Sequence, residues 1–135
     1  MGLDNGLYIK SNVRKITRDM LPEEMFYPFE HDYDDVVQVL YWRKYWGVRN
    51  EVMRTFGWYD GDTGYYELDT PAKVMRFIEI VASWLNEERW EDDGNSIWAY
   101  NEVRLSLIHD IINLSIIYTL MESNPDIYLI FYDSY

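Results

Sequence analysis

The segment from Ile111 to Met121 constrains the fold of this chain more than any other stretch of its sequence. Only Asn113, Ser115 and Thr119 interrupt the run, so a helix over this segment is apolar on nearly every side. Such a helix must be covered on every side, and the run is far too short to cross a bilayer, which takes roughly 20 apolar residues. We therefore expect it to be the central helix of the fold or one half of a dimer contact.

Three helices are predicted, over residues 43–56, 71–88 and 96–122. In the first two, apolar residues recur at the spacing of one helix face. Gly57 follows the first helix, where a left-handed residue commonly ends one. Thr70 and Pro71 suit the N-cap and the first position of the second helix. Asn124 and Pro125 end the third.

Four strands are predicted, over residues 3–10, 35–42, 65–67 and 127–132. In the first, Leu7 and Ile9 alternate with Tyr8 and Lys10, which indicates a strand with one buried face. The second is apolar on both faces, which predicts a central strand. No repeat or linker interrupts the chain, so residues 1–135 are expected to form a single α+β domain. Its small, mostly antiparallel sheet would be packed by the three helices.

Acidic residues outnumber basic ones by 24 to 12, which gives a formal net charge of −12. They gather in three clusters: Asp19, Glu23, Glu24, Glu30, Asp32, Asp34 and Asp35; Asp60, Asp62, Glu67 and Asp69; and Glu91, Asp92, Asp93 and Glu102. A field of this sign repels nucleic acid and anionic membranes and attracts basic protein surfaces. We expect a protein partner with a basic surface, and neither direct nucleic-acid binding nor membrane binding.

Cysteine is absent from the sequence, which excludes a disulfide framework and a thiolate zinc site. The first residues lack the basic and apolar pattern of a secretion signal, so a cytoplasmic protein is expected. The segment Asp60-Gly61-Asp62-Thr63-Gly64 resembles a cation-binding loop. It lacks the full ligand spacing and the terminal Glu of an EF-hand, however, and an exposed turn is the commoner meaning of such a segment. No metal and no cofactor are expected.

An enzymatic interpretation depends on His109, one of two histidines in the chain. Glu102 lies on the same helix face as His109, whereas Asp110 points about 100° away, and no metal-ligand spacing is present. A solvated helix face is the favoured interpretation. The alternative is a small nucleotide- or small-molecule-processing enzyme that combines His109 with the Trp42-Arg43-Lys44 corner. The sequence has no nucleophile elbow and no phosphate-binding glycine loop, so no catalytic residue is assigned.

Three stretches of the sequence occur together in a recognisable order: the opening Met1-Gly2-Leu3-Asp4, then Tyr41-Trp42-Arg43-Lys44 before a Trp-containing helix, and finally Phe131-Tyr132-Asp133-Ser134-Tyr135. In this order the chain resembles a family of small uncharacterised proteins encoded by bacteriophages and prophages. The resemblance implies a viral setting in the cytoplasm of a host cell. Small acidic proteins there often block host defence by occupying nucleic-acid sites on CRISPR effectors or restriction enzymes. For this chain such a role is an analogy that depends on charge alone.

The leading hypothesis is a non-enzymatic protein-interaction module that imitates nucleic acid with carboxylates, in the manner of an anti-CRISPR or anti-restriction inhibitor. The residues expected to bind the partner are Glu23, Glu24, Glu30, Asp32, Asp34, Asp35, Asp60 and Asp62. A third interpretation is an acidic structural protein whose charge serves only solubility, with no site in its acidic loops. Self-association is also predicted, as a homodimer through Ile112, Ile116, Ile117 and Leu120.

Overall fold

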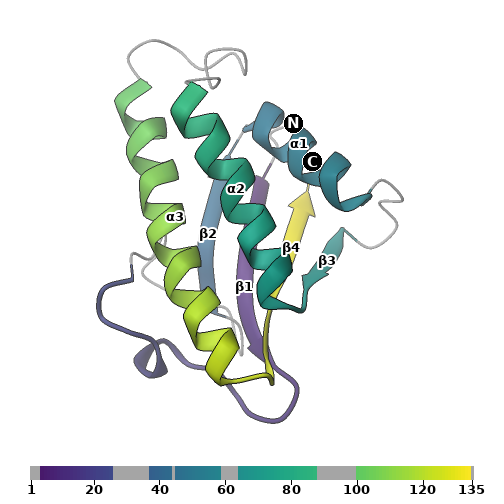
Figure 1. Cartoon of the computed structure of the whole chain (residues 1–135), viewed down its shortest axis with the longest axis vertical. Coiled ribbons are helices and arrows are strands. Elements are labelled where there is room, and N and C mark those ends of the chain that lie inside the picture. The colour runs from purple at the N-terminus through teal and green to yellow at the C-terminus, as the bar shows by residue number, and fades with distance from the viewer. Residues whose placement is uncertain (1–3, 26–36, 44, 59–63, 88–99, 135) are drawn as a thin grey trace.

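The computed structural model describes residues 4–25, 37–43, 45–58, 64–87 and 100–134. In chain order these contain β1 (Asp4–Ser11), the short 3-10 helix η1 (Arg18–Met20), β2 (Val37–Arg43), α1 (Trp46–Phe56), β3 (Tyr65–Leu68), α2 (Pro71–Glu87), α3 (Tyr100–Ser123) and β4 (Ile127–Ser134). The strands form one antiparallel sheet with the order β2-β1-β4-β3. The helices α2 and α3 lie side by side in front of this sheet (Figure 1). The arrangement confirms the predicted α+β class.

The two faces of the sheet differ in character because successive strand residues point to opposite sides. The face beneath the helices is fully apolar at its centre, where Leu7 of β1 pairs with Phe131 of β4 and both are completely buried. The opposite face carries tyrosines from all four strands, namely Tyr8, Tyr41, Tyr65, Tyr128 and Tyr132. Burial therefore alternates from Ile127 to Tyr132 of β4, although the sequence of this stretch is apolar and aromatic throughout.

The prediction that β2 is a central strand is wrong, because β2 lies at one edge of the described sheet. A β-bulge explains its apolar residues: the register with β1 shifts between Leu7 and Tyr8, which leaves Val39 without a partner residue. Val39 is buried, and its carbonyl oxygen accepts a hydrogen bond of 3.0 Å from Nδ2 of Asn113 on α3. The bulge and the helix beside it, rather than a second neighbouring strand, bury this segment.

The ends of the helices follow the predicted signals. Gly57 ends α1 in the left-handed conformation, with a φ of 70°, and the N–H of Trp58 donates to the carbonyl of Met53 at 2.9 Å. Thr70 caps α2, since its Oγ1 accepts a hydrogen bond of 3.2 Å from the N–H of Lys73. Both signals act through local backbone geometry, which is why they could be predicted. α1 begins slightly later than predicted because β2 extends farther along the chain.

A partly buried ion pair ties α1 to the sheet. Nε and NH2 of Arg49 donate to the two carboxylate oxygens of Asp133 on β4, at 3.0 and 2.7 Å. Asn5 on β1 donates to the same carboxylate at 2.6 Å. Because a two-pronged arginine–carboxylate contact is strongly directional, it fixes the orientation of α1 over this end of the sheet.

The centre of the core is an aromatic cluster that joins β2, β4 and α2. The ring centroids of Trp42 and Phe77 lie 5.5 Å apart, and those of Phe77 and Phe131 lie 5.9 Å apart. All three side chains are completely buried. Aromatic pairs at these separations add to the stabilisation that comes from burying their area. Part of the high aromatic content of the chain therefore serves its core.

One row of side chains packs α3 into the molecule. The row consists of Val103, Leu107, Asp110, Leu114, Ile117 and Met121, all buried and spaced as in a heptad. The helix contacts α2, β2 and β4. The prediction that it is covered on every side is wrong for the described residues, because Leu105 is 53% exposed and Ile112 is 37% exposed. Glu102–Ser123 has the length and hydropathy of a membrane span, but a packed core helix meets the same criteria.

Candidate functional site

The acidic segment that follows η1 is anchored to the molecule by apolar side chains. Leu21 and Met25 are buried in the main core. Between them Glu23 and Glu24 are exposed, on a turn in which the N–H of Met25 donates to the carbonyl of Pro22 at 3.2 Å. The two carboxylates are therefore presented on a turn that is held at both ends. We name Pro22–Met25 the acidic turn.

Glu23 and Glu24 are the only two described members of the predicted partner-binding set. The others, Glu30, Asp32, Asp34, Asp35, Asp60 and Asp62, lie outside the described residues. The candidate cation loop, residues 60–64, also lies outside the described residues except for Gly64, which has a φ of 67°. Within the described ranges, no group of three or more His, Asp or Glu side chains could hold a metal ion.

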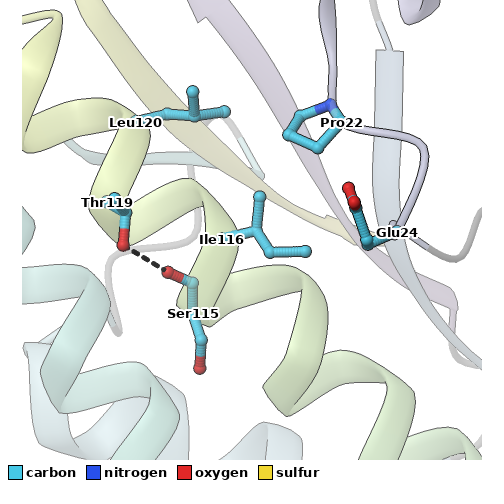
Figure 2. A pocket seen from close by; sticks show the side chains of 6 residues that line it. All are labelled: Pro22, Glu24, Ser115, Ile116, Thr119 and Leu120. Carbon is cyan, nitrogen blue, oxygen red and sulfur yellow. Dashed lines mark hydrogen bonds between the residues drawn. The ribbon is translucent and has the colours of Figure 1, made fainter.

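An open groove of about 400 Å³ lies between the acidic turn and α3. Its lining residues are Pro22, Glu24, Ser115, Ile116, Thr119 and Leu120. Figure 2 shows Ile116 pointing from α3 toward Pro22 and Glu24, with Leu120 one turn farther along the helix. This lining is mostly apolar, and it contains one carboxylate and no basic side chain.

Hydrogen-bonding groups at the groove are largely occupied by the protein itself. Oγ1 of Thr119 donates to the carbonyl of Ser115 at 3.3 Å, and Oγ of Ser115 donates to the carbonyl of Ile111 at 2.7 Å. Pro22 has no N–H, and its carbonyl accepts the hydrogen bond from Met25. The groove therefore offers apolar contact and a negative charge, with few free donors or acceptors.

Three of the four residues predicted for a homodimer remain accessible. Ile112 is 37% exposed, and Ile116 and Leu120 are partly exposed. Ile117 is completely buried against the core, so it is not available to a second copy. The accessible residues border or line the groove, so any homodimer contact through them would occupy it.

The prediction of a solvated face on α3 is wrong for Asp110, which is 6% exposed. Asn113, farther along the same helix, is 2% exposed. Oδ2 of Asp110 accepts a hydrogen bond of 2.8 Å from Nε1–H of Trp42. Burial raises the pKa of Asp110 to about 7, and the hydrogen bond from Trp42 offsets only part of this effect. The carboxyl group therefore titrates near neutral pH.

Tyr45 lies close to the same carboxyl group. Burial is the main cause of its raised pKa, the charges of Asp110 and Glu102 add to it, and a hydrogen bond with Ser106 opposes it. A carboxyl, a phenol and a hydroxyl thus meet between α3 and the start of α1. Groups of this kind can transfer protons. The groove includes none of them, and Trp42, which holds the carboxyl, is completely buried.

The described members of the predicted enzymatic set, Trp42, Arg43 and His109, do not meet in one pocket. Trp42 lies beneath the helices, whereas Arg43, the next residue of β2, is exposed on the tyrosine face. His109 is partly exposed on α3, and Lys44 lies outside the described residues. A site built from this corner would need groups from opposite faces of the sheet.

Two features of the site were not predicted from the sequence, the buried position of Asp110 and the groove itself. A buried tryptophan N–H needs an acceptor, so Trp42 signals that a partner exists without naming it. The groove is formed by Pro22 and Ile116, which are far apart in the chain, and no local pattern brings them together.

Comparisons with protein-family models, with curated proteins and with solved structures give no match to this chain. The acidic turn, the groove and the buried carboxyl group are therefore the features that bear on function. The resemblance to a phage family remains a prediction.

Proposed function

We propose that this protein is a non-enzymatic interaction module that docks on a basic surface of a host nucleic-acid-binding protein. The observation that carries the proposal is the exposure of Glu23 and Glu24 on a turn whose ends are buried. A turn whose backbone is held in this way loses little backbone freedom when it binds, which favours affinity. The finer proposal is an inhibitor of CRISPR or restriction proteins that imitates nucleic acid.

The charge of the whole chain supports the same function. At a net charge of −12, the protein attracts basic surfaces over a distance that depends on ionic strength. Basic surfaces that bind nucleic acid are arranged to meet phosphates, and carboxylates presented on a held turn can occupy the same positions. Complementary charge mainly raises the association rate, so binding should weaken as salt is added.

An enzyme that processes nucleotides or small molecules has less support. Its proposed corner is divided between two faces of the sheet, because Trp42 is buried and Arg43 points the other way. The proton-transfer group around Asp110 has chemistry suited to an enzyme, but it lies among core side chains. A role limited to solubility is the remaining alternative, and it differs from the proposal in requiring no partner.

The decisive experiment compares two double variants in a pull-down from host lysate at low and at high salt. The test variant is Glu23→Gln with Glu24→Gln, and the matched control is Glu67→Gln with Glu79→Gln, which are also exposed. Both variants remove the same charge. We expect wild-type protein and control to retain a basic partner at low salt, and the test variant to lose most of it.

A partner retained equally by both variants would show that the acidic turn is not the contact. Recovery of no basic partner at either salt concentration would overturn the proposal and leave solubility as the role of the charge. High salt should release the partner from wild-type protein, since surface charge pairs are screened beyond about 10 Å at 0.1 M salt and at shorter distances above that.

A further inference from the structure

The outer side of α3 carries an apolar ridge beside the acidic turn. Ile112, Ile116 and Leu120 follow one another at intervals of four residues, so they stack along one side of the helix. Each keeps part of its surface accessible. The ridge is about 12 Å long, which is the rise of eight helical residues, and Pro22 forms a wall next to it. A surface of this length fits about two turns of a second helix.

We infer that the groove receives an amphipathic helix of the protein partner, with apolar side chains against α3 and Lys or Arg side chains beside Glu24. The inference rests on the proposed function and identifies the element through which the partner binds. Apolar rows spaced by four residues are the ridges that helices interdigitate when they pack. An apolar face with basic flanks would match both the ridge and the carboxylate of the lining.

An extended peptide fits the groove less well than a helix. Strand addition needs free backbone N–H and C=O groups along an edge. The floor of the groove is α3, whose backbone groups are bonded within the helix, and the wall is Pro22, whose carbonyl is occupied by Met25. A helix satisfies its own backbone groups and needs only side-chain contact, which is what the groove provides.

Charge selects a basic helix over a second copy of this chain. The lining contains Glu24 and no cation, and Glu23 is exposed next to it. A two-fold contact through the groove would bring the acidic turns of two copies together, each copy with a net charge of −12. Like charges placed opposite one another oppose association, whereas Lys or Arg beside Glu24 favours it.

The inference is tested with a fluorescein-labelled peptide of Leu and Lys whose leucines form one helical stripe. A scrambled peptide of the same composition lacks the stripe and is the reference. Fluorescence anisotropy measures the dissociation constant of each peptide from the wild-type protein at low salt. We expect the striped peptide to bind at least about tenfold more tightly, because only it places apolar side chains along the ridge. Equal binding would overturn the inference and indicate attraction by charge alone.

Two pairs of variants locate the contact. Thr119→Lys places a cation in the groove, and Ser123→Lys makes the same charge change outside it; both positions are exposed. We expect Thr119→Lys to weaken striped-peptide binding about tenfold and Ser123→Lys to change it little.

Ile116→Ser removes part of the ridge, with Leu105→Ser as its exposed apolar control on the same helix. Thermal unfolding verifies that each variant folds. If Ile116→Ser does not fold, Thr119→Lys decides the outcome.

Light scattering of the wild-type protein tests whether a second copy of the chain occupies the groove instead. A mass of two chains that falls to one in Thr119→Lys would overturn the inference in favour of a second copy in the groove. The failure of the inference also differs from a failure of the proposed function. If Glu23→Gln with Glu24→Gln abolishes the pull-down while Thr119→Lys leaves it intact, the interaction module stands and the groove is not its contact.

Discussion

Asp110 lies in the buried row of α3, between positions that are occupied by apolar side chains. Its neighbours in the buried row are Leu107 and Leu114, and it has the same degree of burial as they do within a few per cent. A buried carboxylate with one neutral donor is poorly compensated, so the protonated form is favoured. Asp110 accepts the hydrogen bond of the Trp42 indole N–H, and its raised pKa makes the stability of the fold depend on pH.

The free energy of unfolding should fall as pH rises from about 4 to about 7 because of Asp110. Between the ordinary pKa of 3.8 and the folded value of about 7, the folded protein binds more protons than the unfolded chain. Stability is therefore lost as pH rises through this window, by about 4 kcal/mol in total from the shift, and changes no further above it. Asp110→Asn keeps an oxygen acceptor for Trp42, so we expect it to flatten this slope and to be the more stable protein at pH 8.

Denaturant unfolding across the pH range measures both proteins. Asp126→Asn is the control, because hydrogen bonds from Ser11 and Arg14 lower the pKa of Asp126. The contribution of Asp126 to the free energy of unfolding has the opposite sign, and it is lost as pH falls below the ordinary pKa range of Asp. A wild-type stability that does not change between pH 5 and pH 8 would show that Asp110 remains ionised in the folded protein.

At the scale of elements, the ends of helices were predictable and the neighbours of strands were not. Gly57 and Thr70 act on the backbone within a few residues, so the sequence alone contains their signal. The edge position of β2 depends on β1 and β4 pairing across the whole chain, and the bulge at Val39 depends on Asn113 of α3. For the same reason the exposed acids of the site could be predicted, whereas the groove beside them could not.

Two glycines with nearly the same backbone conformation should respond differently to alanine. Gly57 and Gly64 have φ values of 70° and 67°. A Cβ at Gly57 meets no atom within 4 Å, whereas a Cβ at Gly64 lies 2.8 Å from the carbonyl oxygen of Asp133. Gly57→Ala should therefore cost about 1 kcal/mol, from backbone strain alone. Gly64→Ala should cost clearly more, because its carbonyl also accepts the N–H of Asp133 at 2.8 Å and holds it in place.

Chemical denaturation of the two variants in the same buffer measures this difference. Both variants lose stability through the same backbone strain. The difference between the two losses in free energy of unfolding therefore isolates the steric contact between β4 and the start of β3. Equal losses would mean that the chain around Gly64 moves away from Asp133 without cost.

At the scale of the whole molecule, most of the charge lies outside the contacts that hold the fold together. The ion pair of Arg49 and Asp133 is partly buried and holds elements together, whereas Glu23, Glu24, Glu67 and most other described acids face water. Exposed like charges repel one another in the compact state and less so in the expanded one. The folded protein therefore carries an electrostatic penalty that its core offsets.

Thermal stability should rise with added sodium chloride. Screening shortens the reach of charge repulsion from about 30 Å at 0.01 M salt to about 8 Å at 0.15 M salt, which relieves the folded state of a −12 protein. Calorimetry across this range measures the effect. A variant with the eight predicted partner-binding acids changed to amides has a net charge of −4, from −12 plus 8, and its midpoint should respond less. A wild-type midpoint that is unchanged or lowered by salt would contradict the expectation.

The order of strands also determines when the chain can fold during its synthesis. β1 is synthesised well before β4 (Ile127–Ser134), which is one of its two neighbours in the sheet. Until those residues have emerged, one edge of β1 has no partner, and Leu7 and Ile9 have no Phe131 or Leu129 beside them. A growing chain that does not yet include β4 therefore carries an unpaired edge and exposed apolar side chains, the state in which aggregation and chaperone capture occur. The sheet is expected to form only after β4 has been synthesised.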